Sequence, residues 1–215
     1  EGVFQLESSG MKQVLVGLQP QNLEDVIALI SLYRPGPMDS IPTYLRNRHE
    51  PDKISYKTPQ LAHILDVTNG CIVYQEQVMQ IFRELAGFSF GQADNVRRAM
   101  SKKKHAVMEA EREHFVHGCT EPGHECPGCV ANGISEKVAN EIYDEMSSFA
   151  SYAFNKSHAA CYAYVAFQTA YLKCHYPSEF MAALLTSVLD NTDKVIEYSG
   201  ECARLGIKVL PPDVN

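Results

Sequence analysis

Residues 159–177, AACYAYVAFQTAYLKCHYP, decide the fold class of this chain. When this stretch is wound as a helix, it is apolar nearly all round and has no clear polar face. A helix that is hydrophobic on every side is normally buried among other elements, because none of its sides is suited to water. The stretch therefore predicts a central, buried helix in a protein built mainly from helices.

Helical patterns continue on both sides of this stretch. Downstream, Pro177 begins another helix, and a last helix over 192–205 ends at Gly206, a typical C-terminal cap. Upstream, apolar residues recur at helical spacing behind Ser, Thr or Asn caps, which predicts helices over 8–18, 22–33, 58–65, 74–87, 91–101, 104–117 and 135–146. Only 207–210 is typical of a strand, and the polar, poorly patterned residues 39–57 predict a mobile loop. The predicted fold is mainly α, with nine or ten helices and little or no sheet.

The composition is that of a folded protein with a local binding surface. The chain has 215 residues, of which 45% are hydrophobic, so it can bury a real core and form one large domain or one and a half. The formal charge of −7 argues against nucleic-acid coating by the whole surface. Any binding of nucleic acid must therefore come from a local basic patch.

The sequence also indicates where the protein works. No run of about 18 uncharged apolar residues is present, and no signal peptide, so we expect a soluble, cytoplasmic protein with no membrane partner. The first residue is Glu1 and the last residues are LPPDVN, which suggests a piece of a longer protein. Seven cysteines in such a chain do not predict a disulfide framework.

Residues 95–105, NVRRAMSKKKH, concentrate positive charge in this acidic protein. On a helix, one side carries basic residues and the other carries Val96, Met100 and Val107. We saw no acidic partners interleaved with the run, as a salt-bridged surface helix would have. The run predicts a site for phosphate or another polyanion, with a merely solvated face as the alternative; its cations are Arg97, Arg98, Lys102, Lys103 and Lys104.

A second cationic group stands just before the apolar stretch: Asn155, Lys156, Ser157 and His158. Asn155 or Ser157 can cap the long helix and leave free N–H groups beside a lysine and a histidine, which predicts an anion site. Simple capping with exposed Lys and His is the alternative. Arg34, in the stiff turn RPGP, is a further candidate for phosphate or carboxylate binding, against an ordinary helix-ending loop.

A loop rich in Cys and His predicts a structural zinc site. Cys119, His124, Cys126 and Cys129 are spaced C-x4-H-x-C-x2-C, with Pro127 and Gly128 in the last gap. Three thiolates and an imidazole suit the tetrahedral geometry of Zn²⁺, and C-x2-C is a frequent half-site. His117 is a rival for the fourth position, and free thiols in a variable hairpin are the alternative.

The chain lacks a recognisable catalytic centre. Asp66, Asp94, Asp144 and Asp190 each stand alone, and no Asp-x-Asp pair is present of the kind that holds two metal ions. No nucleophile with a paired base is evident either. We therefore expect this chain to catalyse nothing on its own.

Seven segments, in their order and spacing, resemble the family C replicative DNA polymerases, the catalytic alpha subunits of bacterial DNA polymerase III. They are GVFQLESSGM (2–11), LYRPGPMDS (32–40), IVYQEQVMQI (72–81), NVRRAMSKKK (95–104), YAFNKSHAACYA (152–163), TAYLKCHYPSEFMAALLT (169–186) and LGIKVLPPDVN (205–215). The resemblance covers nearly the whole chain and only the fingers region of such a polymerase. It departs from the common pattern at Ser101, where glycine is usual, and in the Cys/His loop.

The resemblance implies a helical fingers domain over 1–206, with 207–215 starting a linker to the next domain. Such a domain closes over the template-primer DNA and the incoming dNTP, while Mg²⁺ and its aspartates belong to a palm outside this chain. Other replicase subunits, such as the sliding clamp, would bind elsewhere. The implied nucleotide and DNA contacts are Arg34, Arg97, Arg98, Lys102, Lys104, Asn155, Lys156, Ser157 and His158.

Two other functions remain open from the residues alone. One is a zinc-stabilised helical module that binds nucleic acid independently of polymerisation, and the other is a docking domain whose basic helix meets an acidic partner. The polymerase hypothesis requires that the clusters around Arg97 and Lys156 converge on one concave wall, without acidic side chains separating them.

Overall fold

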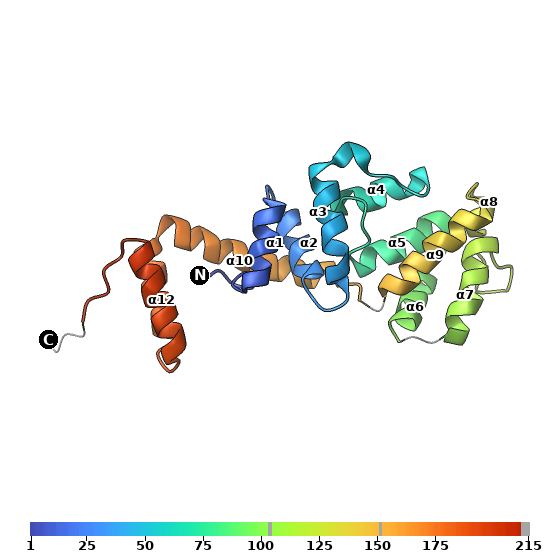
Figure 1. The fold of residues 1–215 in the computed structure, drawn as a ribbon. Helices are drawn as coiled ribbons and strands as arrows, with labels where there is room; N and C mark the ends of the chain where they lie inside the picture. The colour runs from blue at the N-terminus through green and yellow to red at the C-terminus, as the bar shows by residue number, and fades with distance from the viewer. Residues whose placement is uncertain (103–104, 151, 212–215) are drawn as a thin grey trace. The chain divides into compact units, whose positions relative to one another are not determined.

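The computed structural model describes residues 1–102, 105–150 and 152–211, and these are mainly α-helical (Figure 1). They contain twelve α-helices and four short 3₁₀ helices but no strand, which confirms the predicted fold class. The α-helices are α1 (Ser9–Leu18), α2 (Leu23–Leu32), α3 (Ile41–His49), α4 (Ala62–Leu65), α5 (Gln75–Ala86), α6 (Phe90–Ser101), α7 (His105–His117), α8 (Gly128–Ala131), α9 (Glu136–Ala150), α10 (Lys156–His175), α11 (Pro177–Ser187) and α12 (Thr192–Arg204). The 3₁₀ helices are η1 (Pro37–Ser40), η2 (Pro51–Lys53), η3 (Pro59–Leu61) and η4 (Asp66–Thr68).

The chain forms two compact units. One consists of Glu1–Val16 together with Cys161–Asn215, and the other consists of Gly17–Ala160. Helices α1 and α10 each continue from one unit into the other. The division into a fingers domain over 1–206 and a linker that begins at 207 stays a prediction. None of the described helices has the length and hydropathy needed to span a membrane.

The core of the unit Gly17–Ala160 lies among α5, α6, α7 and α9, which Figure 1 draws together. Phe82 of α5 is fully buried at its centre. The ring centroid of Phe82 lies 5.0 Å from that of Phe115 and 6.0 Å from that of Tyr143, both in edge-on arrangements that aromatic pairs favour. The Tyr143 hydroxyl donates to the Met108 carbonyl at 2.6 Å, so burial leaves no polar group of Tyr143 unpaired.

Local capping explains where these helices begin and end. The Asn22 side chain accepts from the Asp25 N–H at 3.0 Å and starts α2, as its sequence predicts. At α6, the Ser89 hydroxyl accepts from the Gln92 N–H and the Gln92 side chain accepts from the Ser89 N–H, a reciprocal capping box. Gly87 ends α5 with a φ of 75°, a conformation that glycine adopts without strain.

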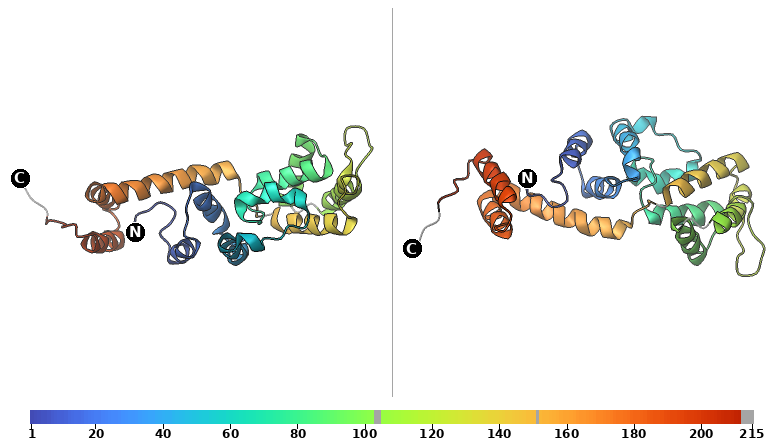
Figure 2. Two further views of the ribbon diagram at one scale, coloured as in Figure 1. Left: turned by 90° about the horizontal axis from the view of Figure 1, so that it is seen from above. Right: turned by 60° about the horizontal axis from the view of Figure 1, so that its bottom comes forward.

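The other unit has a smaller core, built where α11 and α12 pack together (Figure 2). Met181, Tyr198 and Cys202 are buried there, and Phe180 and Leu184 pack against them. Asn191 caps α12 by accepting from the Lys194 N–H at 3.1 Å. This core is much smaller than that of the other unit, so polar contacts carry more of its stability.

Helix α10 forms as predicted, but the expectation that it is a buried helix is wrong. Only a stripe of small residues is buried, namely Ala159, Ala163 and Ala166, which share one face at helical spacing. The large side chains on the other faces are exposed, with Tyr164 at 56% and Phe167 at 55%. Apolar composition on all sides therefore predicted the helix correctly and its environment incorrectly, because burial depends on what packs against each face.

Two further expectations are corrected. Residues 39–57 are not a loop, since α3 together with the 3₁₀ helices η1 and η2 occupies most of them. Ile41 and Tyr44 lie one turn apart on α3 and are both buried, so two well-placed apolar residues suffice to anchor it. Residues 207–210 form no strand among the described residues; Ile207 instead packs against the core of α11 and α12. The basic run and the following stretch are separate helices, α6 and α7.

Candidate functional site

A cleft of about 490 Å³ lies in the unit Gly17–Ala160, between α5, α6 and the residue that precedes α10. Its wall includes Gln75 and Glu76 from α5, Asp94 and Arg97 from α6, and Asn155. Arg97 belongs to the first predicted cationic cluster and Asn155 to the second. One member of each cluster therefore lines the same concave surface, together with the acidic residues Glu76, Glu84 and Asp94.

Arg97 is held firmly in this wall. Its Nε and Nη2 donate to Asp94 Oδ1 at 3.0 and 2.8 Å, and its Nη1 donates to Gln75 Oε1 at 2.9 Å. Only 18% of its side chain is exposed. A guanidinium fixed by two different helices presents its charge in a defined direction, which suits recognition of phosphate.

Gln75 connects Arg97 to the segment before α10. Its backbone N–H donates to Phe154 O at 2.9 Å, and its side-chain amide donates to Ala153 O at 3.0 Å. Phe154 in turn donates its N–H to Val73 O at 3.2 Å. This role could not be predicted from the sequence, since Gln75 is one neutral amide in a run of polar residues at the start of a helix.

The N-terminus of α10 already holds a carboxylate. Asn155 caps the helix by accepting from the His158 N–H at 2.9 Å, which confirms the capping interpretation for this residue. Glu76 accepts from the Asn155 side-chain amide at 3.0 Å, and both of its oxygens accept from the Lys156 N–H at 3.1 Å. The anion predicted for this helix end is thus supplied by the protein itself, where the helix dipole favours negative charge.

The rest of the second cluster points elsewhere. Lys156 Nζ lies 2.9 Å from a carboxylate oxygen of Glu24 and 5.3 Å from the ring centroid of buried Tyr74. The His158 ring packs against the Phe154 ring, with centroids 5.2 Å apart, and Ser157 is exposed. None of these three lines the cleft, although they adjoin Asn155 in sequence.

Arg34 holds the segment before α10 rather than the cleft. Its Nε donates to Ser31 O at 3.0 Å and its Nη2 donates to Tyr152 O at 2.8 Å, while its guanidinium lies 4.0 Å from the Phe154 ring centroid. Burial lowers the pKa of Arg34, because it penalises the charged form. The structure thus gives Arg34 a set of internal partners that fix Tyr152 and Phe154 near α5.

The expectation that the basic run lacks acidic partners is wrong for its two arginines. Asp94, one turn upstream, also accepts from Arg98 Nε at 2.7 Å. The pKa of Asp94 is lowered, above all by its hydrogen bonds from Arg97 and also by the positive charges of Arg97 and Arg98. Lys102 is exposed at the end of α6, and Lys104 lies outside the described residues. The cleft is therefore mixed in charge, with Glu76, Glu84 and Asp94 facing Arg83 and Arg97.

The predicted zinc ligands lie around one short hairpin. Cys119 and Cys126 oppose each other in an antiparallel bridge, Cys129 is fully buried in α8, and His124 is exposed. The rival His117 has its ring 3.9 Å from Glu136. A metal site needs at least three ligand atoms close together, and no three of these Cys and His ligand atoms lie within 4.8 Å of one another. Among the described residues, only Glu1, Glu7 and Glu197 meet that distance condition. Zinc binding stays a prediction.

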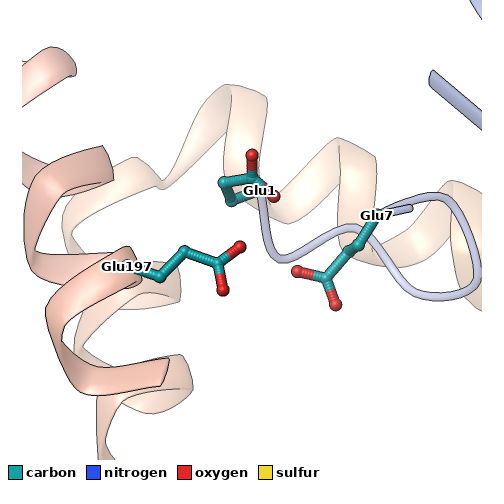
Figure 3. Close-up of side chains that lie close together, drawn as sticks. All are labelled: Glu1, Glu7 and Glu197. Carbon is teal, nitrogen blue, oxygen red and sulfur yellow. The ribbon is translucent and has the colours of Figure 1, made fainter. Parts of the chain in front are cut away.

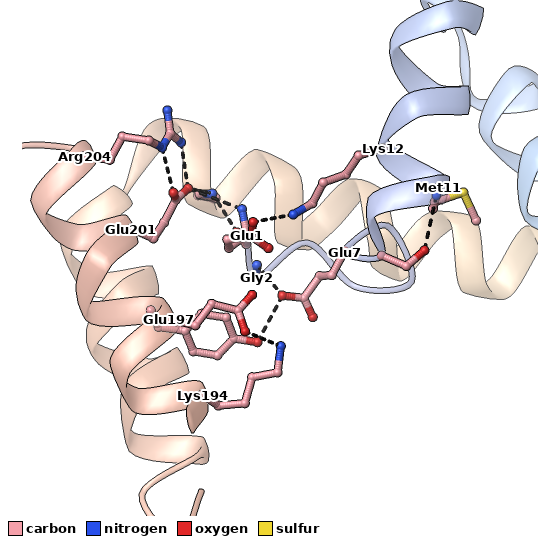
Figure 4. A network of polar contacts seen from close by, with 12 residues as sticks. Glu1, Gly2, Glu7, Met11, Lys12, Lys194, Glu197, Glu201 and Arg204 are labelled. Carbon is pink, nitrogen blue, oxygen red and sulfur yellow. Dashed lines mark hydrogen bonds and ion pairs between the residues drawn. The ribbon is translucent and has the colours of Figure 1, made fainter. Parts of the chain in front are cut away.

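The three glutamates lie close together in the other unit, with their carboxylates facing a common space (Figure 3). Each of them already has a donor. Lys12 pairs with Glu1, the Tyr198 hydroxyl donates to Glu7 at 3.0 Å, and Lys194 donates to Glu197 at 2.7 Å (Figure 4). All three carboxylates thus have donors within the protein, and we assign the cluster no ligand.

Comparison with known proteins gives consistent matches. The family model described as the bacterial DNA polymerase III alpha subunit finger domain matches residues 1–123. The DNA polymerase III subunit alpha of Thermus aquaticus is 51% identical over 220 residues, which cover 100% of this chain and 17% of that protein. The corresponding subunits of Pasteurella multocida and Bacillus subtilis are each 48% identical, with 99% and 100% of this chain covered and 18% of each relative. The chain thus spans less than a fifth of the length of these relatives.

Proposed function

Because this chain belongs to the finger-domain family of the bacterial DNA polymerase III alpha subunit, we propose that it binds the incoming dNTP and the template-primer in a replicative DNA-directed DNA polymerase. The triphosphate would lie in the cleft between α5, α6 and the start of α10. Nucleotidyl transfer itself would be carried out by a palm domain outside this chain.

The observation that carries the proposal is the meeting of Arg97 and Asn155 in one cleft. Phosphoryl transfer needs positive groups that hold the triphosphate in line and neutralise the leaving pyrophosphate. A guanidinium anchored to Asp94 and Gln75 meets this need, since little reorganisation is required when the phosphate arrives. Arg98, which is 65% exposed on the same helix and bonded to the same Asp94, would add a second contact.

In this proposal, the carboxylates of the cleft accept hydrogen bonds from the donors that would bind phosphate, and the phosphate displaces them. Asp94 holds both arginines, and Glu76 holds the N–H groups at the start of α10. Phosphate oxygens make the same kind of charge-assisted hydrogen bonds and carry more charge. Binding of the nucleotide would therefore exchange one set of acceptors for another.

The Mg²⁺ expected in such a polymerase does not fit the cleft. Glu76, Glu84 and Asp94 do not bring three ligand atoms within 4.8 Å of one another. Hydrogen bonds to arginines and amides also occupy Asp94 and Glu76. We therefore assign no metal-dependent step to this chain, whose residues bind and orient the substrate.

Substitution of the arginines tests the proposal in the full-length polymerase. Arg97→Ala and Arg98→Ala should each raise the KM for dNTP and lower kcat, so that kcat/KM falls more than tenfold, on the order of 1.4 kcal/mol. Arg46→Ala is the matched control, because Arg46 is an exposed arginine on α3 that does not line the cleft. Steady-state kinetics that are unchanged in the Arg97 and Arg98 variants would remove the cleft from the nucleotide site.

The parent protein would have further partners. We propose that it works in the bacterial cytoplasm on template-primer DNA and that other replicase subunits, such as a sliding clamp, bind regions outside this chain. The rival view, an autonomous nucleic-acid-binding module, requires that the isolated chain bind duplex DNA with a steep salt dependence. A mixed-charge cleft in a protein of net charge −7 gives that view little support.

A further inference from the structure

The hairpin that contains the Cys/His motif does not line the cleft, and its two arms lie very close to each other. Cys119 and Cys126 exchange both backbone hydrogen bonds, each with an N to O distance of 2.9 Å. In such an antiparallel pair the two residues stand directly opposite each other and their side chains leave from the same face, with Cβ atoms about 5 Å apart. The two thiols therefore project to one side of the hairpin.

Two glycines allow the strands of the hairpin to approach each other. Gly118 and Gly128 have φ values of 88° and 78°. A Cβ atom on Gly118 would lie 2.6 Å from the Cys126 carbonyl oxygen, and one on Gly128 would lie 2.3 Å from the Gly118 nitrogen. No side chain fits at either position. The turn at Pro127 and Gly128 thus folds the backbone tightly, in the manner of a C-x2-C metal knuckle.

All three cysteines pack against the same buried cluster. Cys126 and Cys129 belong to it, and Cys119 contacts it from the edge. The Cys126 Sγ also lies 3.6 Å from the His114 carbonyl oxygen at the end of α7. The three cysteines therefore lie where α7, α8 and the core meet, although no three of the Cys and His ligand atoms lie within 4.8 Å of one another.

We propose that Cys119, Cys126, Cys129 and His124 bind one structural zinc ion. Tetrahedral Zn²⁺ with Zn–S bonds of about 2.3 Å requires sulfur atoms about 3.8 Å apart. Rotation of the cysteine side chains on a fixed hairpin brings them together, and His124, exposed at the hairpin tip, turns inward to complete the set. Three thiol protons leave when the ion binds, so the completed site carries one negative charge.

Zinc analysis of the full-length polymerase tests the proposal. Cys119→Ser is the main variant, because Cys119 is only partly buried and serine there should preserve the fold. Elemental analysis should find about one zinc ion fewer per polymerase than in the wild type. Cys161→Ser, at an exposed cysteine on α10, is the control and should retain the wild-type zinc content. Comparison of variants makes the result independent of other zinc sites in the polymerase.

Cobalt substitution identifies the ligands. The difference spectrum between Co²⁺-loaded wild type and Cys119→Ser should contain thiolate charge-transfer bands and tetrahedral d–d bands. His124→Ala should shift the d–d bands and His117→Ala should leave them unchanged; the reverse result would overturn the assignment of His124. Equal zinc content in wild type and Cys119→Ser would overturn the whole site, as would a metal-free Cys119–Cys126 disulfide detected by mass spectrometry.

Discussion

At the scale of single residues, the cleft depends on side chains that hold other side chains. Arg97 is directed by Asp94 on its own helix and by Gln75 on α5, and Gln75 also fixes the segment that carries Asn155. Arg34 secures that segment from the other side, through Tyr152. The groups that face the proposed nucleotide are thus positioned by residues that do not themselves need to touch it.

Asp94→Asn should separate the two roles of this carboxylate. The substitution removes one negative charge from a cleft whose carboxylates outnumber its cations, while the amide oxygen can still accept from Arg97. In the full-length polymerase we expect the KM for dNTP to fall about two- to fivefold, with a smaller change in kcat, which is the size of a partly exposed ion pair. Steady-state kinetics measure this directly, and a rise in KM would mean that Asp94 acts mainly by orienting Arg97.

The sequence predicted two residues of the cleft, Arg97 and Asn155, but not Gln75. Arg97 stood out by the concentration of charge around it, and Asn155 by its position before a long apolar helix. Gln75 carried no such signal, because its function comes from three contacts with residues distant in sequence. For the same reason, the pairing of Lys156 with Glu24 was not predictable, since it depends on how α2 meets the start of α10.

At the scale of elements, local patterns predicted helices reliably and their surroundings less well. Capping residues such as Asn22 fixed helix starts, because the hydrogen bonds involved lie within one turn. Helix α3 was missed because only Ile41 and Tyr44 anchor it in a polar stretch. The exposure of Tyr164 and Phe167 on α10 could not be read from composition, since it depends on which face other elements cover.

The hairpin of the Cys/His motif offers an element-scale test that does not involve metal. Gly128→Ala places a Cβ atom 2.3 Å from the Gly118 nitrogen at a φ of 78°. Gly123→Ala is the matched control, because Gly123 has a similar φ of 86° but nothing within 4 Å of its Cβ position. We expect Gly128→Ala to destabilise the chain by about 1–3 kcal/mol more than Gly123→Ala. Urea unfolding of both variants measures the difference, and equal midpoints would show that the strands are not in close contact.

At the scale of the whole molecule, the two units are stabilised differently. The unit Gly17–Ala160 has a large apolar core, whereas the other relies on a small core and on ion pairs around Glu201. Glu201 is 6% exposed and pairs with Arg204 at 2.7 Å and with Lys173. A buried carboxylate with two cationic partners makes stability depend on pH.

Glu201→Gln should therefore have an effect that changes with pH. Hydrogen bonds from Arg204 foremost, and then from Lys173, hold the pKa of Glu201 well below its ordinary value of 4.5, although burial opposes them. A depressed pKa means that the stabilisation is fully present above pH 4.5 and declines as the pH falls below it.

The difference in Tm between wild type and Glu201→Gln, measured by circular dichroism, should be largest at neutral pH and shrink by about pH 3.5. Glu197→Gln on the same helix is the control, because Glu197 is an exposed residue whose ion pair is with Lys194. A difference in Tm for Glu201→Gln that is the same at both pH values would assign the stabilisation to packing instead of charge.

The division of the chain also dictates an order of events during synthesis. One unit is continuous in sequence over Gly17–Ala160, whereas the other is assembled from Glu1–Val16 and Cys161–Asn215. At about 5–20 residues per second, a ribosome needs roughly 7–30 s to make the intervening part. During that interval Phe4 has no Thr169 to accept its N–H hydrogen bond, and the backbone nitrogen of Glu1 has no Glu201 to accept from it. Residues 1–16 are thus made well before the residues after 160 with which they form one unit.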